Sequence, residues 1–305
     1  SVIDKAIENG CELIITHHPV IFESIKKIND STILGKKILK LIKNGINVYS
    51  AHTNLDSAKD GLNNYIAQKL LAKDTKIMDE NFYSVYKMNI FVSKSILAEV
   101  LSILNGSREL EFLEYKRVTY TSKVTERVLV NNEIKELDSY NIQIMGEKNK
   151  LYSILNKIRE KHSISEIAFE ILPLENKHKT GTGFGRFFKL ENPMSLEEYI
   201  SFVKDKLNLD FVKVVKANDK LIKKVAVVNG SGAEFWKKAY DMGADVFITG
   251  DFKYHNALDA YEKGLNIVDI GHYEAEHFFY EIIIKKLDDN LRVEVYNEKR
   301  ILEIK

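Results

Sequence analysis

The chain has 305 residues, of which 45% are hydrophobic and 29% are charged, a composition typical of a globular protein with one or two domains. Its formal net charge of +1 gives no electrostatic support for nucleic acid as a partner, and it has no run of about 18 consecutive apolar residues that would span a membrane. Cys11 is the only cysteine, which excludes an intrachain disulfide and favours a reducing, cytoplasmic location.

The first predicted elements are a helix over residues 1–8 and a short buried strand from Leu13 to Ile15. Asn9-Gly10 is a typical end for such a helix. A parallel sheet normally has a strand before a helix that leads into a strand. We therefore expect a strand to precede this first helix.

Two adjacent histidines follow this strand, in the run Thr16-His17-His18-Pro19. Proline favours an extended conformation for the residue before it, and successive extended residues point to opposite sides of the backbone. His17 and His18 are therefore expected to bind two different ions, which favours a two-metal site over a mononuclear one. The alternative is a solvated turn that binds no metal.

A second polar cluster follows the next predicted strand. The sequence predicts a helix from Ser31 to Lys43 and a buried strand from Ile46 to Tyr49. The polar run from Ser50 to Asp56 comes directly after this strand. Asp56 is the better ligand candidate, because a carboxylate is fully ionised at neutral pH. His52 is a candidate ligand, a partner of a ligand, or a proton carrier.

The middle of the chain has a different pattern, in which strands and helices follow one another as in a ferredoxin-like module with one possible extra strand. Strands are expected at 86–92, 112–121, 125–130, 140–145 and 166–172, and helices at 93–104 and 148–161. This segment contains one of the eight histidines, His162, and no clustered carboxylates. We therefore expect an inserted module without metal chemistry of its own.

A glycine-rich run from Thr180 to Arg186 follows the middle segment. Glycine-rich backbone with one arginine is able to hold a phosphate. The run has the spacing of neither phosphate-binding fingerprint, however, and a tight crossing between domains is the favoured interpretation.

Three buried strands are predicted in the last third of the chain, Val225–Val228, Val246–Thr249 and Ile267–Ile270. His272 and Glu276 follow the last of them, on the first turn of a predicted helix. Residues four apart share one helical face, with their Cβ atoms roughly 5–6 Å apart, so both side chains are able to hold one cation. The alternative is that Glu276 only complements the helix N-terminus and that His272 is a cap or core residue.

Histidine, aspartate and glutamate residues gather after four of the predicted strands, and open α/β sheets place their sites just outside the carboxyl ends of their strands. Six of the eight histidines lie near these ends: His17, His18, His52, His255, His272 and His277. This concentration predicts a metal site.

Four motifs carry a resemblance to a known family: THHPVIF at 16–22, SAHTNLD at 50–56, ITGDFKYHNALDA at 248–260 and GHYEAE at 271–276. Together they resemble the NGG-one-interacting-factor-three-like family, whose members are often labelled GTP cyclohydrolase type-two homologues. The resemblance covers about residues 1–82 and 178–305. The segment between them resembles the insertion of longer bacterial members, which is similar to nitrogen-regulatory and copper-tolerance signalling folds.

The resemblance implies an α/β fold with two related lobes of mostly parallel strands, at 1–82 and 178–305, around a dinuclear metal site. It also implies a ferredoxin-like α+β domain inserted at 83–177 and assembly as a toroidal homohexamer. The first lobe lacks the first strand–helix unit that family members normally have. Carried over by motif, the ligands of two divalent ions are His17, His18, Asp56, His272 and Glu276, with Glu276 bridging. Such mixed ligands suit zinc, iron, manganese or nickel.

The function expected from these observations is metal-dependent hydrolysis of a nucleotide-like substrate, as in a GTP cyclohydrolase. Two ions about 3.5–4 Å apart are able to share a bridging water and lower its pKa. His52 and His255 are the candidate general acid or base. The competing expectation is a non-enzymatic protein, either a ring scaffold whose metals hold the lobes together or a regulatory metal-binding protein.

Overall fold

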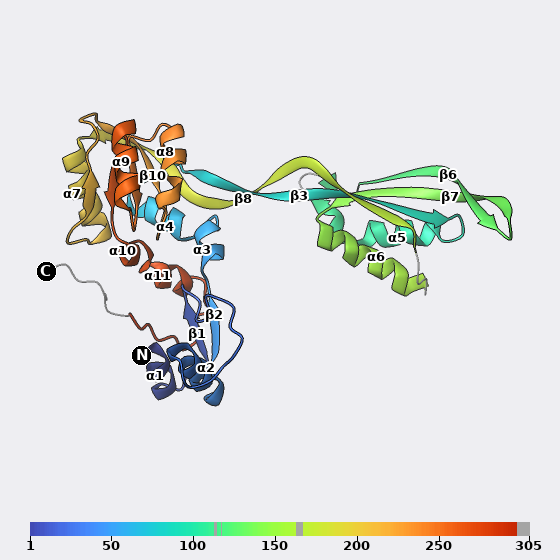
Figure 1. Cartoon of the computed structure of the whole chain (residues 1–305), viewed down its shortest axis with the longest axis horizontal. Coiled ribbons are helices and arrows are strands. Elements are labelled where there is room, and N and C mark those ends of the chain that lie inside the picture. Colours follow the sequence, from blue (N-terminus) through green and yellow to red (C-terminus); the bar gives the residue numbers. More distant parts are fainter. Residues whose placement is uncertain (113–114, 117, 163–166, 298–305) are drawn as a thin grey trace. The chain divides into compact units, whose positions relative to one another are not determined.

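The computed structural model describes residues 1–112, 115–116, 118–162 and 167–297. The chain divides into two compact units (Figure 1). Unit 1 comprises residues 1–81 and 181–305, and unit 2 comprises residues 82–180. Two long strands, β3 (Lys76–Ser93) and β8 (Phe169–Met194), belong to both units.

Unit 1 begins with a small parallel sheet and two helices. The elements are α1 (Val2–Glu8), β1 (Leu13–Thr16), α2 (Ile33–Lys43) and β2 (Asn47–Ser50). β1 pairs with β2 in parallel, with Leu13 opposite Asn47 and Thr16 opposite Ser50. The two carboxyl ends therefore lie at the same edge, which brings the segments that follow β1 and β2 together.

β1 and β2 are only partly buried, whereas the sequence predicts two buried strands. Leu13 is 50% exposed and Tyr49 is 54% exposed. Among the described residues, α1 and α2 cover the face of this sheet on which Ile14 packs with Ile3 and Leu41. Side chains alternate along a strand, so Leu13 and Tyr49 point to the other face. The apolar residues of these strands predicted burial, but they did not show whether helices cover one face of the sheet or both.

The rest of unit 1 is built on a larger sheet in the order β8-β10-β11-β12-β9. β10, β11 and β12 are parallel, and β8 and β9 are antiparallel to their neighbours. The elements are α7 (Leu196–Leu207), β9 (Lys213–Val215), β10 (Ile222–Val227), α8 (Trp236–Asp241), β11 (Val246–Thr249), α9 (Tyr254–Lys263) and β12 (Asn266–Asp269).

The three central strands are buried on both faces, as predicted. On one face Val227 and Ile248 share a core with α7 and with α4 (Leu62–Lys69). On the other face Phe247 and Ile267 pack with α8 and α9. α4 comes from the first part of the chain, so its place in this core holds the two segments of unit 1 together.

The segment after β12 forms two short helices, α10 (His272–Glu276) and α11 (Phe279–Ile284), where the sequence predicts one continuous helix. The break lies at His277. Its Nδ1 is 3.2 Å from the Glu274 carbonyl oxygen, which in a continuous helix would accept from the Phe278 N–H. His272 and Glu276 still lie on one helical turn.

Unit 2 contains a sheet in the order β6-β7-β3-β8. Its other elements are α5 (Leu97–Gly106), the 3₁₀ turn η1 (Arg108–Leu110), β4 (Glu111–Phe112), β5 (Tyr115–Lys116), β6 (Thr119–Val130), β7 (Glu133–Gly146) and α6 (Lys148–His162). Apolar residues of β3, β7, α5 and α6 form its core. Three residues of the strand predicted at 112–121, at 113, 114 and 117, lie outside the described residues, as does the start of the strand predicted at 166–172.

The strands predicted at 112–121 and 125–130 are not separate in the structure. β6 runs without interruption from Thr119 to Val130 and forms a hairpin with β7. Asn131 and Asn132 both have positive φ, at 51° and 64°, as a two-residue hairpin turn requires. The sequence interpretation placed a break near Ser122, where polar residues on the exposed strand resemble a turn.

The glycine-rich run lies within β8, and its arginine is used internally. Arg186 is buried, and its guanidinium donates hydrogen bonds to the carbonyl oxygens of Gly183, Gly185, Ala58 and Lys59. A Cβ built on Gly183 would overlap the Asp79 carbonyl oxygen, so β8 passes close to β3 here. These four hydrogen bonds to backbone carbonyl oxygens support the tight crossing. In the described part of the chain, no helix has the length and apolar character needed to cross a membrane.

Candidate metal centre

His17 lies directly after β1 and is buried. Its Nδ1 is 2.8 Å from the Ala51 carbonyl oxygen, so Nδ1 carries the proton in the neutral ring and Nε2 presents a lone pair. Nε2 is buried without a hydrogen-bond partner among the described residues. A buried imidazole nitrogen in this condition suits a metal ligand, whose other nitrogen is normally held by a carbonyl or carboxylate.

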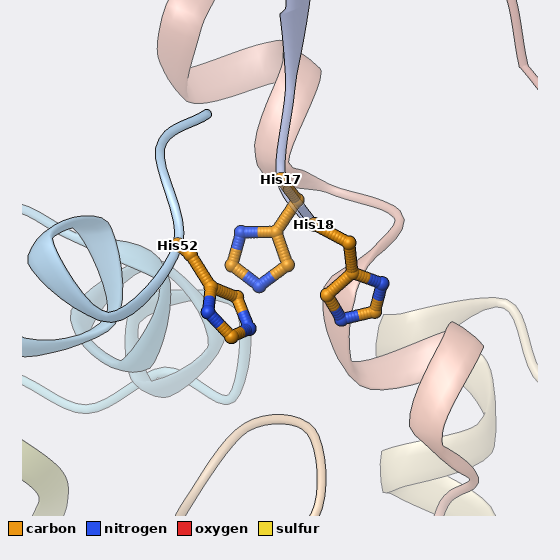
Figure 2. Close-up of side chains that lie close together, drawn as sticks. All are labelled: His17, His18 and His52. Atoms are coloured by element: carbon orange, nitrogen blue, oxygen red, sulfur yellow. The ribbon is translucent and has the colours of Figure 1, made fainter. Parts of the chain in front are cut away.

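His17 and His18 do not point to opposite sides of the backbone as the extended-chain argument predicts. Their ring centroids are 5.2 Å apart, and the rings are tilted by 39° (Figure 2). The reason is that the strand ends at Thr16, whose hydroxyl donates to the His18 carbonyl oxygen at 2.8 Å and closes a tight turn. The assignment of the two histidines to different ions remains a prediction.

Glu276 lies at the centre of the cluster, and its two carboxylate oxygens face different partners. Oε1 is 3.5 Å from His17 Nε2. Oε2 is 3.1 Å from His18 Nε2 and 3.1 Å from His272 Nε2. A carboxylate with imidazole nitrogens on both oxygens has the geometry expected of a bridging ligand.

Asp56, on α3 (Thr53–Ser57), completes the side of the cluster that contains His17. Its Oδ1 is 3.6 Å from His17 Nε2. The Asn229 side-chain amide donates to the same oxygen at 2.8 Å. The five ligands implied by the sequence motifs are therefore brought together, His17, Asp56 and Glu276 on one side and His18, His272 and Glu276 on the other.

His272 is held by a carboxylate on its outer side. Its Nδ1 is 2.7 Å from Asp251 Oδ2, and the Asp251 backbone has a φ of 54°. Its Nε2 is buried and faces Glu276 Oε2 at 3.1 Å, and among the described residues no contact of this nitrogen has hydrogen-bond geometry. This carboxylate–histidine arrangement fixes the ring orientation of a metal ligand.

The charges in the cluster stabilise one another. Burial alone would raise the pKa of Glu276, but the neighbouring His17, His18 and His272 outweigh it and hold the pKa well below its ordinary value. The Glu276 carboxylate, assisted by Asp251 and opposed by burial, raises the pKa of His272 to about 9. Burial raises the pKa of Asp56, opposed by His17.

His52 and His255, the two candidate acid–base residues, are placed differently. The His52 ring lies 5.1 Å from the His17 ring and 5.2 Å from the His18 ring, and Figure 2 shows the three imidazoles side by side. Burial and the nearby His17 lower the pKa of His52. His255 is exposed on α9, where its described ring contact is with Tyr254. The structure brings His52 into the cluster and does not bring His255 there.

The donor atoms fit divalent metal ions. Two sets of potential ligands each have their donor atoms within 4.8 Å of one another: His17, His18 and His52, and His18, His272 and Glu276. Two buried imidazole nitrogens that face carboxylate oxygens without a geometric hydrogen bond, and a carboxylate shared between histidines, match the ligand chemistry of a zinc, iron, manganese or nickel site.

Sequence reasoning missed Asp251 and Asn229, which contact ligands without being ligands of the proposed ions. Both directly follow strands of the larger sheet, as the predicted ligands follow theirs. Asp251 lies in the motif at 248–260, so the sequence did offer its carboxylate as a candidate. Asn229 carried no such signal.

Metal affinity is expected to rise with pH between pH 7 and 9. With a pKa of about 9, His272 is protonated at pH 7 in the metal-free protein, and a metal ion must displace that proton. The affinity should increase about tenfold per pH unit for each proton displaced. Titration calorimetry in two buffers of different ionisation enthalpy measures the proton release directly. Affinity that does not change over this range would contradict the assignment of His272 as a ligand.

A family model matches most of the chain. Residues 1–301 match the family model described as Duf34/NIF3 (NGG1p interacting factor 3), a range that includes unit 2. A GTP cyclohydrolase 1 type 2 homolog of Bacillus subtilis is 35% identical over 298 residues, covering 94% of this chain and 79% of the relative. A homolog of the same name from Halalkalibacterium halodurans is 35% identical over 311 residues, covering 97% and 82%. The crystal structure of a Bacillus cereus protein related to NIF3 superposes with a TM-score of 0.71 at 30% identity, covering 98% of this chain and 86% of that one.

Proposed function

The chain belongs to the Duf34/NIF3 family, and from this premise we propose that it binds two divalent metal ions and hydrolyses a nucleotide-like substrate. The observation that carries the proposal is the position of Glu276 between two sets of ligands. His17, Asp56 and Glu276 Oε1 would hold the first ion. His18, His272 and Glu276 Oε2 would hold the second.

Bound at these positions, two divalent ions would polarise an oxygen of the electrophile and lower the pKa of a water molecule. His52 supplies a proton acceptor, because burial and His17 lower its pKa and keep the ring neutral at neutral pH. The side chains of His18 and His272 are 53% and 35% exposed, so this side of the cluster is open to a substrate. An accessible site is typical of catalytic metal centres.

The nucleotide-like substrate is inferred from the relatives, which carry the name GTP cyclohydrolase 1 type 2 homolog. The experiment is a screen of nucleotides, with GTP first, and of generic phosphoesters in each of the four metal forms. Purine absorbance and phosphate release report ring opening and phosphoester cleavage separately. Metal-dependent turnover is the expected result. The absence of turnover in every metal form, with thermal stability that follows metal occupancy, would contradict the hydrolase.

A non-enzymatic function is the second candidate, and the origin of the ligands favours it. His17, His18 and Asp56 come from residues 1–81, whereas His272 and Glu276 come from residues 181–305. Bound ions would therefore tie the two segments of unit 1, as in a structural site. A toroidal homohexamer built from such units, serving as a scaffold or regulatory metal-binding protein, is the form that this candidate takes.

Unit 2 is proposed to be a ferredoxin-like domain inserted into the metal-binding unit, similar to signalling proteins. In the sheet order β6-β7-β3-β8, the first strand of a strand–helix–strand–strand–helix–strand unit lies between the third and the last, and the second strand lies outside the third. None of the five proposed metal ligands lies in it.

Replacing residues 84–175 with a short Gly-Ser linker is expected to leave the metal content of the protein unchanged. The segments that lead to these ends approach each other, because the Asn81 side-chain amide donates to Thr182 Oγ1 at 3.3 Å. Circular dichroism establishes folding, and elemental analysis gives the number of ions per chain. A folded deletion variant with reduced metal content would show that the boundaries or the ligand assignment are wrong.

A further inference from the structure

The loop Asn229-Gly230-Ser231-Gly232, directly after β10, touches both carboxylates of the cluster. We propose that this loop is a positioning element, in which Asn229 orients Asp56 and Gly230 gives Glu276 the space to reach the metal ions. The inference rests on the proposed metal-binding function and adds two residues that are not themselves ligands.

Asn229 belongs to a buried network that holds Asp56 at two points. Its side-chain amide donates to Asp56 Oδ1 at 2.8 Å, and its backbone N–H donates to Asn63 Oδ1 at 2.9 Å. The Asn63 amide in turn donates to the Asp56 carbonyl oxygen at 3.0 Å. Both asparagines are buried, so bulk water does not compete for their hydrogen-bonding groups.

Asp56 needs such support because its own helix provides little. α3 has five residues and no side-chain hydrogen bond at its N-cap, and helices this short have little stability of their own. Asn229, in contrast, follows Val227 and Val228, which are buried in the centre of the larger sheet. The network therefore holds Asp56, a ligand on a short helix, against a loop that follows a rigid strand.

Gly230 acts by lacking a side chain. A Cβ built at this position would overlap Glu276 Oε1, the oxygen that faces His17. The residue also has a φ of 59°, which favours glycine. Any side chain here would push the central carboxylate away from its position between the two sets of ligands.

The two residues should therefore affect the ions differently. Asn229 contacts Asp56, which belongs only to the first ion, so its loss should weaken one ion and spare the other. Gly230 contacts Glu276, which is shared, so a side chain there should weaken both. Substitutions that disturb the second shell of a metal site typically reduce affinity about 10- to 100-fold.

The test is titration of the metal-free full chain with Zn²⁺, by calorimetry against a competing chelator, in wild type and Asn229→Leu. Leucine keeps the shape of asparagine and removes the donor. We expect one ion with wild-type affinity and the other weakened at least about tenfold. The matched control is Asn266→Leu, which removes a buried asparagine of the same sheet that bonds Ala217, Asn218 and Asp245 and contacts none of the ligands. Both ions should bind normally to it.

Gly230→Ala is compared with Gly264→Ala, which has a similar φ of 76° but no atom within 4 Å of the added Cβ. Only Gly230→Ala should weaken the binding of both ions, because the backbone strain is common to the two variants. Wild-type affinity for both ions in Asn229→Leu, or equal weakening in Asn229→Leu and Asn266→Leu, would overturn the inference.

The wild-type titration keeps the two proposals apart. Fewer than two ions in wild type would reject the metal-binding proposal and the inference that depends on it. Two ions in wild type, together with variants that bind both ions as tightly as wild type, would reject only the positioning role. In the metal-free crystal structure of Asn229→Leu, the Asp56 carboxylate should have turned from its wild-type orientation, and an unchanged carboxylate would also count against the inference.

Discussion

Replacing Glu276 with glutamine is expected to remove most of the metal from both positions. The two oxygens of the carboxylate face different partners, His17 on one side and His18 and His272 on the other. An amide keeps one oxygen, presents an NH₂ donor in place of the second, and removes the negative charge shared by both ions. Elemental analysis of the metal-replete variant measures the loss.

The matched control for this variant is Glu281→Gln. Glu281 lies on α11, and its carboxylate contacts Tyr65 and Lys69 and none of the proposed ligands. Glu281→Gln removes the same charge from a neighbouring helix, so the metal content of this variant should equal that of wild type. A Glu276→Gln protein that retains both ions would contradict the bridging role.

The second large effect separates an enzyme from a scaffold. Asp56→Asn and His18→Ala should abolish turnover of the substrate found in the screen, because each removes a ligand. His52→Ala should keep its metal and lower turnover roughly 10²–10⁴-fold, as expected for loss of a general acid or base. Both kcat and metal content are to be measured on the same preparation.

A scaffold predicts a different pattern. The ligand variants would lose thermal stability or oligomeric assembly, and His52→Ala would behave as wild type. His255→Ala tests the other acid–base candidate in the same assay. Because His255 is exposed on α9 and lies outside the described cluster, we expect nearly normal turnover. A loss as large as that of His52→Ala would place His255 in contact with the substrate.

The five ligand candidates follow from the resemblance of the motifs, and strand ends and helical spacing, which are local patterns, explain why these residues come together. His272 and Glu276 are four residues apart on α10, and their facing atoms are 3.1 Å apart. The two strands that precede His17 and Asp56 pair in parallel, which brings their carboxyl ends to one edge. These relationships need only the order of elements and the geometry of strands and helices.

The supporting residues could not be chosen in this way, since their roles depend on tertiary pairing. Asn229 meets Asp56 only because α4 packs into the core of the larger sheet, across 173 residues of sequence. The sequence also could not separate His52 from His255, because both follow strands in recognised motifs. The turn closed by Thr16 was missed for a similar reason, since a proline rule describes one residue and not the turn around it.

The most direct test of the dinuclear centre is anomalous X-ray scattering from crystals of the metal-replete protein, combined with elemental analysis of the same sample. We predict two ions per chain that share Glu276. The first should lie at roughly 2.0–2.2 Å from donor atoms of His17 and Asp56, and the second at the same distance from His18 and His272. At most one ion per chain, or two ions without Glu276 between them, would contradict the account.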